Sequence, residues 1–259
     1  MQIRRHLAPA IVLAGLVSSQ AIAAAEEQLP KGEDILDKFV EATGGKAAYE
    51  KVHNEMWTGT FEFVGKGIKG TATAYRAEPK KTLTTIELEG VGTIVEGTDG
   101  ETAWTNSSLQ GPRLKEGDEK AIAIREATFR GPVLWRKLYK QAEVTGVETV
   151  DGEPCYKVIL TPNEGKSQTE YYDKKTNLMV KMVMTLASPM GEIPAETTLS
   201  DYQEQNGLRS PRKVHQKALG QEFLITIESV KYNIDLPKDR FDMPAEVKAL
   251  VAKTEPASK

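Results

Sequence analysis

Residues Leu199 to Pro244 decide the fold and read LSDYQEQNGLRSPRKVHQKALGQEFLITIESVKYNIDLPKDRFDMP. Asn206-Gly207 separates two strand-like runs, and Asn-Gly is the dipeptide that best accommodates the positive φ angles of a tight hairpin. A second turn at Leu219-Gly220 precedes a run with apolar residues at every second position: Phe223, Ile225 and Ile227. A period of two places these side chains on one face of a strand. The stretch therefore predicts consecutive antiparallel strands, which end at Pro244 because proline has no N–H for a ladder.

The first half of the chain repeats this pattern. Trp57, Phe61 and Phe63 share one face of a strand that starts near Met56. Further strand-like runs follow at 71–76, 83–88, 93–96 and 102–106, separated by short turns. Strands at intervals of about ten residues are typical of an antiparallel meander. We therefore expect a mainly β (α+β) fold, in which one strongly curved antiparallel sheet of about ten to twelve strands forms an open or half β-barrel.

Three segments interrupt the strands. Apolar residues at helical spacing predict a helix over Gly32–Lys51, broken at Gly44-Gly45 because glycine destabilises a helix interior by about 1 kcal/mol. Gly111–Lys140 is expected to break the meander, and Glu116–Tyr139 within it contains two short helix-like runs. Ala245–Lys253 predicts a short C-terminal helix followed by a polar tail. A helix with one apolar face must bury that face. We expect the first two segments to cover the open side of the sheet.

Strands resume at Ala142–Val150, and Asp151-Gly152 is another hairpin signal. Further on, a period of two places Val180, Met182, Met184 and Leu186 on one face, with Met179 and Val183 opposite. Methionine adapts to irregular ligands, although it also serves as ordinary core filling. Two prolines and a glycine predict a loop over Ala187–Ala195. Its Met190 and Ile193 fit either a lid over a hydrophobic cavity or packing on the edge of the protein.

Several of these blocks together resemble the LolA/LolB-like superfamily of periplasmic lipoprotein carriers. They are Asp201-Tyr202, the Asn206-Gly207 turn, Ser210-Pro211 with its basic strand, TI-x-SV-x-x-N from Thr226 to Asn233, Phe241-Asp242-x-Pro244, DGETAWTN (Asp99–Asn106) and VDGEPCYKVILTPNEGKSQTEYYDKKTNLMVKM (Val150–Met182). The resemblance implies a curved sheet, covered by helices, whose concave face holds a ligand. It contains no catalytic motif, and no ligand-gating residue of the family maps onto a matching motif here.

The N-terminal segment Met1–Ala25 has the features of a secretory signal peptide. Arg4 and Arg5 precede a short apolar run, and Ala21-Ile22-Ala23 supplies an A-x-A cleavage site. The alternative is an uncleaved anchor, although the run is too short to span about 30 Å of hydrocarbon. We expect residues 26–259 to form one exported, soluble periplasmic domain. Without Arg4 and Arg5 it carries 32 basic and 37 acidic residues, a balance that argues against a nucleic-acid partner.

The residue types that usually carry catalysis or bind metals are sparse. Cys155 is the only cysteine, so no intramolecular disulfide is possible; a small buried residue is the simpler interpretation, and an intermolecular bridge is the alternative. His53 and His215 lie far apart and lack metal-ligand spacing. The run Gly65–Gly70 fits G-x-G-x-x-G, but strand-like residues follow it, so we expect a hairpin turn. The sequence predicts no enzyme activity, no cofactor and no metal.

The function predicted from these features is that of a periplasmic carrier. It would bind a lipid, or the acyl chains of a lipoprotein, for outer-membrane lipoprotein or lipid sorting, with envelope membrane proteins as further partners and no membrane-spanning segment. The candidate ligand-binding residues are the period-two apolar side chains: Trp57, Phe61, Phe63, Trp104, Met182, Met184, Phe223 and Ile225. Two alternatives are a structural or accessory subunit of an envelope complex, whose core those residues would fill, and a carboxylate-dependent hydrolase.

Overall fold

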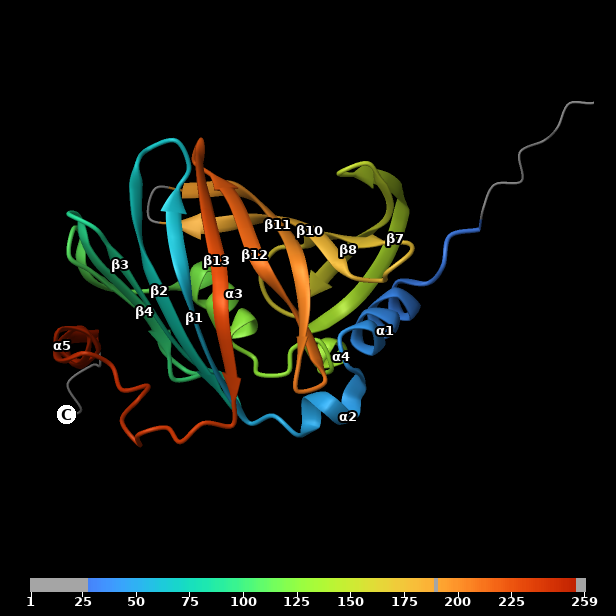
Figure 1. Cartoon of the computed structure of the whole chain (residues 1–259). Coiled ribbons are helices and arrows are strands. Elements are labelled where there is room, and N and C mark those ends of the chain that lie inside the picture. Colours follow the sequence, from blue (N-terminus) through green and yellow to red (C-terminus); the bar gives the residue numbers. More distant parts are fainter. Residues whose placement is uncertain (1–27, 189–190, 255–259) are drawn as a thin grey trace, which may run out of the picture.

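The computed structural model describes residues 28–188 and 191–254, and thirteen strands within them form one antiparallel sheet (Figure 1). The strands are β1 (Asn54–Phe63), β2 (Ile68–Ala77), β3 (Lys81–Leu88), β4 (Gly92–Thr98), β5 (Ala103–Ser107), β6 (Gly111–Leu114), β7 (Tyr139–Val150), β8 (Glu153–Pro162), β9 (Gln168–Asp173), β10 (Met179–Ser188), β11 (Gly191–Gln205), β12 (Leu208–Ala218) and β13 (Gln221–Tyr232). Their order across the sheet is β6-β5-β4-β3-β2-β1-β13-β12-β11-β10-β9-β8-β7. The sheet is open between β6 and β7, which confirms the expected open, curved architecture with one strand more than we expected.

The sheet consists of two meanders joined by the pairing of β1 with β13. Within each meander, strands that follow one another in the sequence are neighbours. The seam pairs Phe61 with Ile225 and Phe63 with Phe223, so it brings together residues about 160 positions apart. Three of the turns have positive φ angles at both central residues: Asp151-Gly152, Asn206-Gly207 and Leu219-Gly220. These angles match the right-handed twist of the flanking strands, so the three predicted hairpins are confirmed.

Cross-strand partners share a face of an antiparallel sheet, so the register shows which side chains lie together. Met182 of β10 pairs with Thr197 of β11, which pairs with Gln216 of β12. Gln216 pairs in turn with Phe223 of β13, and Phe223 pairs with Phe63 of β1. The methionine of one meander and the phenylalanines of both therefore occupy the same face.

Helix α3 (Gly117–Glu126) shows that this face is the concave one. The helix lies inside the curve of the sheet in Figure 1 and contacts both β5 and β10, although seven strands separate these two in the sheet. A helix of ten residues is only about 15 Å long, so the sheet must curl around it. Arg125 on α3 donates a hydrogen bond to Gln168 of β9 (2.9 Å). Gln168 lies two positions before Glu170, which pairs with Met182, so Gln168 is on the same face of the sheet as Met182.

The N-terminal helices cover the part of the concave face that β7, β8 and β9 form. In α1 (Gly32–Ala42), Ile35, Leu36 and Val40 are buried against α4 (Trp135–Leu138) and the strands β7 to β9. Gly44 ends α1 and precedes α2 (Gly45–Glu50), as the glycine pair predicted. Gly44 has a φ of +132°, and a Cβ there would overlap the carbonyl oxygen of Gly207 in the β11–β12 hairpin. The bend between the helices therefore depends on glycine.

The C-terminal segment covers the convex face near the other edge of the sheet. Helix α5 (Ala245–Thr254) contacts β5 and β6, and its Val247 is fully buried. Upstream of α5, the Arg240 guanidinium lies 4.4 Å from the centroid of the Tyr75 ring. Trp104 of β5 points to the same face as Tyr75. Trp104 pairs with Gly97 of β4, Gly97 pairs with Leu83 of β3, and Leu83 pairs with Tyr75 of β2.

Three parts of the predicted layout are wrong. The last strand ends at Tyr232 and not at Pro244. The region after Gly111 does not leave the sheet at once, because β6 adds a short edge strand first. The loop predicted over Ala187–Ala195 is also too long, since β10 continues to Ser188 and β11 begins at Gly191; Met190 lies outside the described residues. Pro194 is tolerated because the register between β11 and β12 ends at Ala195, so Pro194 pairs with β10 alone.

Candidate functional site

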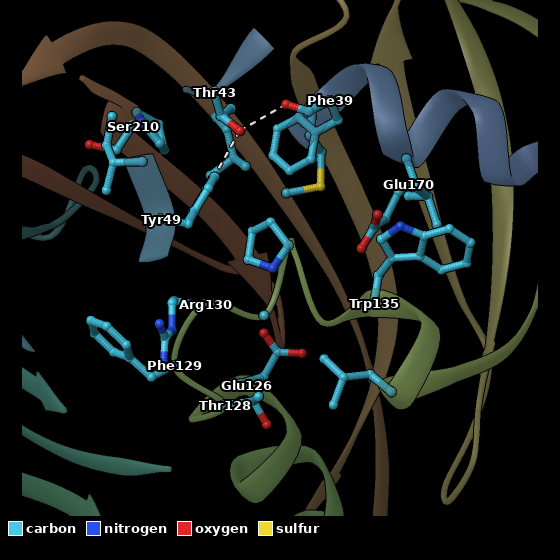
Figure 2. A pocket seen from close by; sticks show the side chains of 18 of the residues that line it. Phe39, Thr43, Tyr49, Glu126, Thr128, Phe129, Arg130, Trp135, Glu170 and Ser210 are labelled. Atoms are coloured by element: carbon cyan, nitrogen blue, oxygen red, sulfur yellow. Dashed lines mark hydrogen bonds between the residues drawn. The ribbon is translucent and has the colours of Figure 1, made fainter. Parts of the chain in front are cut away.

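A cavity of about 400 Å³ lies between the concave face of the sheet and the segments that cover it. Figure 2 shows side chains from α1, the α3–α4 connection and the sheet converging on this space. Its apolar wall includes Leu36, Phe39, Trp135, Met179, Met182 and Leu199. A volume of this size falls in the range of small-molecule sites, which are mostly apolar with a few placed polar groups.

Helix α1 supplies one wall of the cavity. The Phe39 ring meets the Tyr172 ring of β9 edge-on, with 5.5 Å between their centroids. Asp37, on the outer side of α1, accepts hydrogen bonds from Trp135 Nε1 (3.1 Å) and from both terminal nitrogens of Arg136 (2.8 and 2.7 Å). The hydrogen bonds from Arg136 lower the pKa of Asp37 below its usual value. This connection holds α1 against α4 and so fixes the position of Trp135.

Two methionines of β10 line the opposite wall because of a β-bulge. Met179 pairs with Tyr172 of β9. The neighbouring residue of β9, Tyr171, pairs with Lys181 of β10, so Val180 is left without a partner on β9. The extra residue shifts the alternation, so Met179 and Met182 both line the cavity. The prediction that these two methionines lie on opposite faces is therefore wrong. The period of two holds only within an uninterrupted strand, and the bulge interrupts it.

A polar network forms part of the cavity wall. Arg125 Nη2 donates to Gln168 Oε1 (2.9 Å), and Gln168 Nε2 donates to Glu170 Oε1 (2.7 Å). The Tyr172 hydroxyl donates to the other oxygen of Glu170. Burial raises the pKa of Glu170 above its usual value, and the hydrogen bonds from Tyr172 and Gln168 oppose that effect. Arg125, Gln168 and Glu170 are each more than 90 % buried, so the protein satisfies these polar groups largely by itself.

Glu126, the last residue of α3, presents its carboxylate to the cavity. In Figure 2 its side chain points into the space between Trp135 and Phe129. The side chain is 50 % exposed although α3 lies inside the curve of the sheet. Its carboxylate lies 3.7 Å from Arg125 Nε. Burial of the whole region raises the pKa of Glu126, and the positive charges of Arg125 and Arg76 oppose this effect.

Two other arginines at the cavity, Arg76 and Arg130, are paired with protein groups. Arg76 of β2 contacts Glu55 Oε1 of β1 (3.3 Å) and donates to the backbone oxygen of Glu126 (2.9 Å). Arg130 donates to Glu78, whose carboxylate also contacts His53. These contacts attach the segment after α3 to β2. The guanidinium groups therefore position the cover of the cavity.

Two hydroxyl groups form hydrogen bonds where α1 joins α2. The Tyr49 hydroxyl donates to Thr43 Oγ1 (2.9 Å), and Thr43 Oγ1 donates to the carbonyl oxygen of Phe39 (2.8 Å), as the dashed lines in Figure 2 show. Burial raises the pKa of Tyr49 to about 12, so this phenol stays neutral at physiological pH. These hydroxyl groups bond to each other and to the helix backbone, which leaves the surrounding wall mainly apolar.

The eight residues predicted as a ligand site fall into three places. Met182 lines the cavity, and Met184 lies two residues further along the same face, 9 % exposed. Five residues pack together at the end of the concave face formed by β1 to β4 and β13, in a cluster around Phe61. They are Trp57, Phe61, Phe63, Phe223 and Ile225. Trp104 lies on the convex face, fully buried under the C-terminal segment.

Several residues of the cavity were not predicted from the sequence. Leu36 and Phe39 could have been identified from the sequence as buried residues, because they belong to the apolar face of a predicted helix. Glu126 could not have been identified from the sequence, since no pattern distinguishes a single carboxylate among 37 acidic residues. Its position follows from the placement of α3 inside the curve, which depends on contacts between residues distant in the sequence.

The cysteine and the two histidines considered as catalytic or metal-binding residues lie in separate parts of the structure. Cys155 lies on β8 and is fully buried, as predicted, and burial raises the pKa of its thiol. His53 contacts Glu78, whereas His215 lies 2.9 Å from Glu222 on another part of the sheet. Within residues 28–188 and 191–254, no group of three His, Cys, Asp or Glu side chains is placed to hold a metal. No helix in this part of the chain is long and apolar enough to cross a membrane.

Comparisons with known proteins agree with this architecture. No family model matches the sequence, and no curated protein matches it. Among solved structures, a DUF1329 family protein from Desulfovibrio piger is 15 % identical over 83 % of this chain and 98 % of its own, with a TM-score of 0.56. A LolA superfamily protein from Nitrosomonas europaea is 14 % identical over 83 % of this chain and 99 % of its own, with a TM-score of 0.55.

A third similar structure is described as a putative outer membrane lipoprotein-sorting protein domain, from Vibrio parahaemolyticus. It is 11 % identical over 82 % of this chain and 97 % of its own, with a TM-score of 0.53. Identities this low support the fold and nothing finer. The chain has a LolA/LolB-like fold, as its strand and turn pattern predicted.

Proposed function

We propose that this protein is a carrier that shelters a hydrophobic ligand in the cavity beneath its concave face. The ligand would be a lipid or the acyl chains of a lipoprotein, and the setting would be outer-membrane lipoprotein or lipid sorting in the periplasm. The observation that carries this proposal is the cavity of about 400 Å³, walled by Leu36, Phe39, Trp135 and two methionines. The shared fold with a structure described as a lipoprotein-sorting domain supports the same function.

The energetics of such a site need no catalytic group. Each CH₂ group buried away from water contributes about 0.8 kcal/mol, so an acyl chain of twelve carbons has ample driving force to offset the entropy lost on binding. The unbranched Met179 and Met182 side chains can adapt to chains of different shape. A non-catalytic carrier is therefore the function that the lining favours.

The cellular part of the proposal comes from the sequence. Met1–Ala25, which lies outside the described residues, would direct export, and residues 26–259 would act as one domain in the periplasm. Loading and release of a lipid would then require membrane proteins of the envelope as transient partners. Export is tested separately from binding, by comparing the N-terminal residue of the mature protein with the predicted cleavage after Ala23 or Ala25.

The binding proposal is tested by filling the cavity. We expect delipidated protein to bind the apolar dye 1-N-phenylnaphthylamine saturably at one site. Leu199→Trp places a larger side chain into the cavity and should abolish most of this binding while the fold is kept. The control is Leu219→Trp, in an exposed hairpin turn, which should bind the dye like the wild type. Equal dye binding by both variants, or no binding by the wild type, would contradict a ligand site here.

A further inference from the structure

The carboxylate of Glu126 distinguishes this cavity from a purely apolar one. Glu126 ends α3, and Figure 2 shows its side chain directed into the space that Phe39 and Trp135 line. The side chain is 50 % exposed while the residue before it, Arg125, is buried. Glu126 lines the cavity, so its exposed surface includes surface that faces the cavity.

The neighbouring groups leave the Glu126 carboxylate with free acceptor capacity. Its contact with Arg125 Nε, at 3.7 Å, is longer than a hydrogen bond, and Arg125 Nη2 is already bonded to Gln168. Arg76 donates to the backbone oxygen of Glu126 and not to its carboxylate. Glu170, by contrast, accepts two hydrogen bonds within the protein. Glu126 is therefore the cavity carboxylate that the protein holds most loosely among the described residues, through the Arg125 guanidinium at 3.7 Å.

A ligand that fills the cavity removes water from this carboxylate. A plain hydrocarbon chain would leave this charged acceptor with only its long contact to Arg125, and burying a charged group with so little hydrogen bonding is unfavourable. A ligand with an N–H or O–H group at the matching position would replace the lost water. The energetic difference between these two ligands gives the site its selectivity.

Resting on the carrier function proposed above, we infer that Glu126 determines ligand specificity by accepting a hydrogen bond from the head group of an amphiphile. The apolar chain of this amphiphile lies against Leu36, Met179 and Met182. The head group is a hydrogen-bond donor, either a primary amine or a hydroxyl group. Anionic heads are disfavoured because they bring two acceptors together, and cations without N–H groups are disfavoured because they cannot donate.

The test is competition for bound 1-N-phenylnaphthylamine by four probes that share a twelve-carbon chain. They are dodecylamine, dodecanol, dodecanoate and dodecyltrimethylammonium, used at pH 7 below their micellar concentrations. For the wild type we expect the amine and the alcohol to compete at concentrations at least about tenfold lower than the other two, which corresponds to about 1.4 kcal/mol. The trimethylammonium probe separates hydrogen-bond donation from simple charge attraction.

Two variants assign the selectivity to Glu126. Glu126→Leu should remove the preference while dye binding is kept, and Glu126→Gln should weaken the amine about tenfold and leave the alcohol within about threefold. Glu87→Leu, on an exposed part of β3, is the control and should retain the wild-type order. Dye binding without any preference in the wild type, or a preference that survives in both Glu126 variants, overturns this inference alone. Absence of dye binding in the wild type overturns the carrier function as well.

Discussion

Single side chains on the concave face fall into two kinds, those that border the cavity and those that fill the sheet interior. Met182 borders the cavity, whereas Met184 is 9 % exposed and lies away from it. Both are unbranched side chains on the same strand and the same face, so sequence alone cannot separate them. The structure makes the two methionines a matched pair for mutagenesis.

We expect Met182→Asp to abolish dye and lipid binding with a modest loss of stability, because water in the cavity can hydrate the new carboxylate. Met184→Asp should lower the free energy of unfolding by several kcal/mol, since its carboxylate would be buried without a partner. Urea denaturation and dye titration on both variants measure the two effects. A Met182→Asp protein that binds like the wild type would contradict a ligand site at this position.

Glu170 gives a prediction about pH. Burial raises the pKa of Glu170 in the folded protein above the ordinary value of 4.5. The folded state therefore holds this proton more tightly than the unfolded state does, so the stabilisation is complete below about pH 4.5 and is lost as the pH rises through the folded pKa. Glu170→Gln resembles the protonated acid and lacks this loss.

The free energy of unfolding of Glu170→Gln, minus that of the wild type, should therefore increase between pH 4.5 and pH 8. Chemical denaturation across that range measures the difference, in which the effects of titrating groups that do not interact with Glu170 cancel. Glu87→Gln, on an exposed strand position outside the cavity, is the control for the same chemical substitution. A flat difference for Glu170→Gln would mean that this carboxyl titrates normally.

At the level of elements, the bend between α1 and α2 connects the helical cover to the β11–β12 hairpin. The backbone N–H of Arg209 donates to the carbonyl oxygen of Thr43 (2.9 Å), immediately before the bend. Gly44 then turns the chain with a φ of +132° while it lies against the carbonyl of Gly207. The Asn206-Gly207 turn therefore closes a hairpin and also supports the α1–α2 bend.

Gly44→Ala should consequently destabilise the protein by more than an ordinary glycine substitution. Its methyl group would meet the Gly207 carbonyl, in addition to the cost of about 1–2 kcal/mol for a non-glycine residue at positive φ. Gly65→Ala is the matched control, because Gly65 has a φ of +72° and its Cβ would meet open space. Thermal unfolding of the two variants tests this, and equal melting temperatures would contradict the described packing.

The elements also show where sequence patterns predict structure and where they do not. Hairpins with Asn-Gly and Asp-Gly were predictable, because positive φ at two successive residues strongly restricts the residue types. Leu219-Gly220 was marked by its glycine alone, since leucine is unusual at positive φ. The bulge before Lys181 was not, since no residue type there marks an extra unpaired position. This one irregularity moved Met179 from the predicted outer face into the cavity wall.

For the whole molecule, the sequence predicted an open, curved antiparallel sheet covered by helices, because local turns and periods define the two meanders. It did not determine which meander edges join, and that pairing of β1 with β13 sets the concave face. Trp104 illustrates the consequence. Its strand alternates like the others, yet register across four strands places it on the convex face beneath the C-terminal segment.

The arrangement of the whole molecule divides the concave face into regions with different roles. The cluster around Phe61 fills one end with its own side chains, and α1 with α4 fills the other. The cavity borders α1 and α4 and lies beneath the segment that connects α3 to α4. A ligand in this position would contact both the sheet and its cover, so binding should also stabilise the attachment of the cover.

The central claim is that the cavity of the native protein holds an amphiphilic lipid. Native mass spectrometry of the protein purified without detergent from the periplasm of the cells that make it, followed by extraction and identification of the bound molecule, tests this most directly. We predict one lipid per protein, with an amine or hydroxyl head group, and its loss from the Leu199→Trp variant but not from Leu219→Trp. A wild-type protein that carries no lipid and cannot be loaded with one would contradict the account.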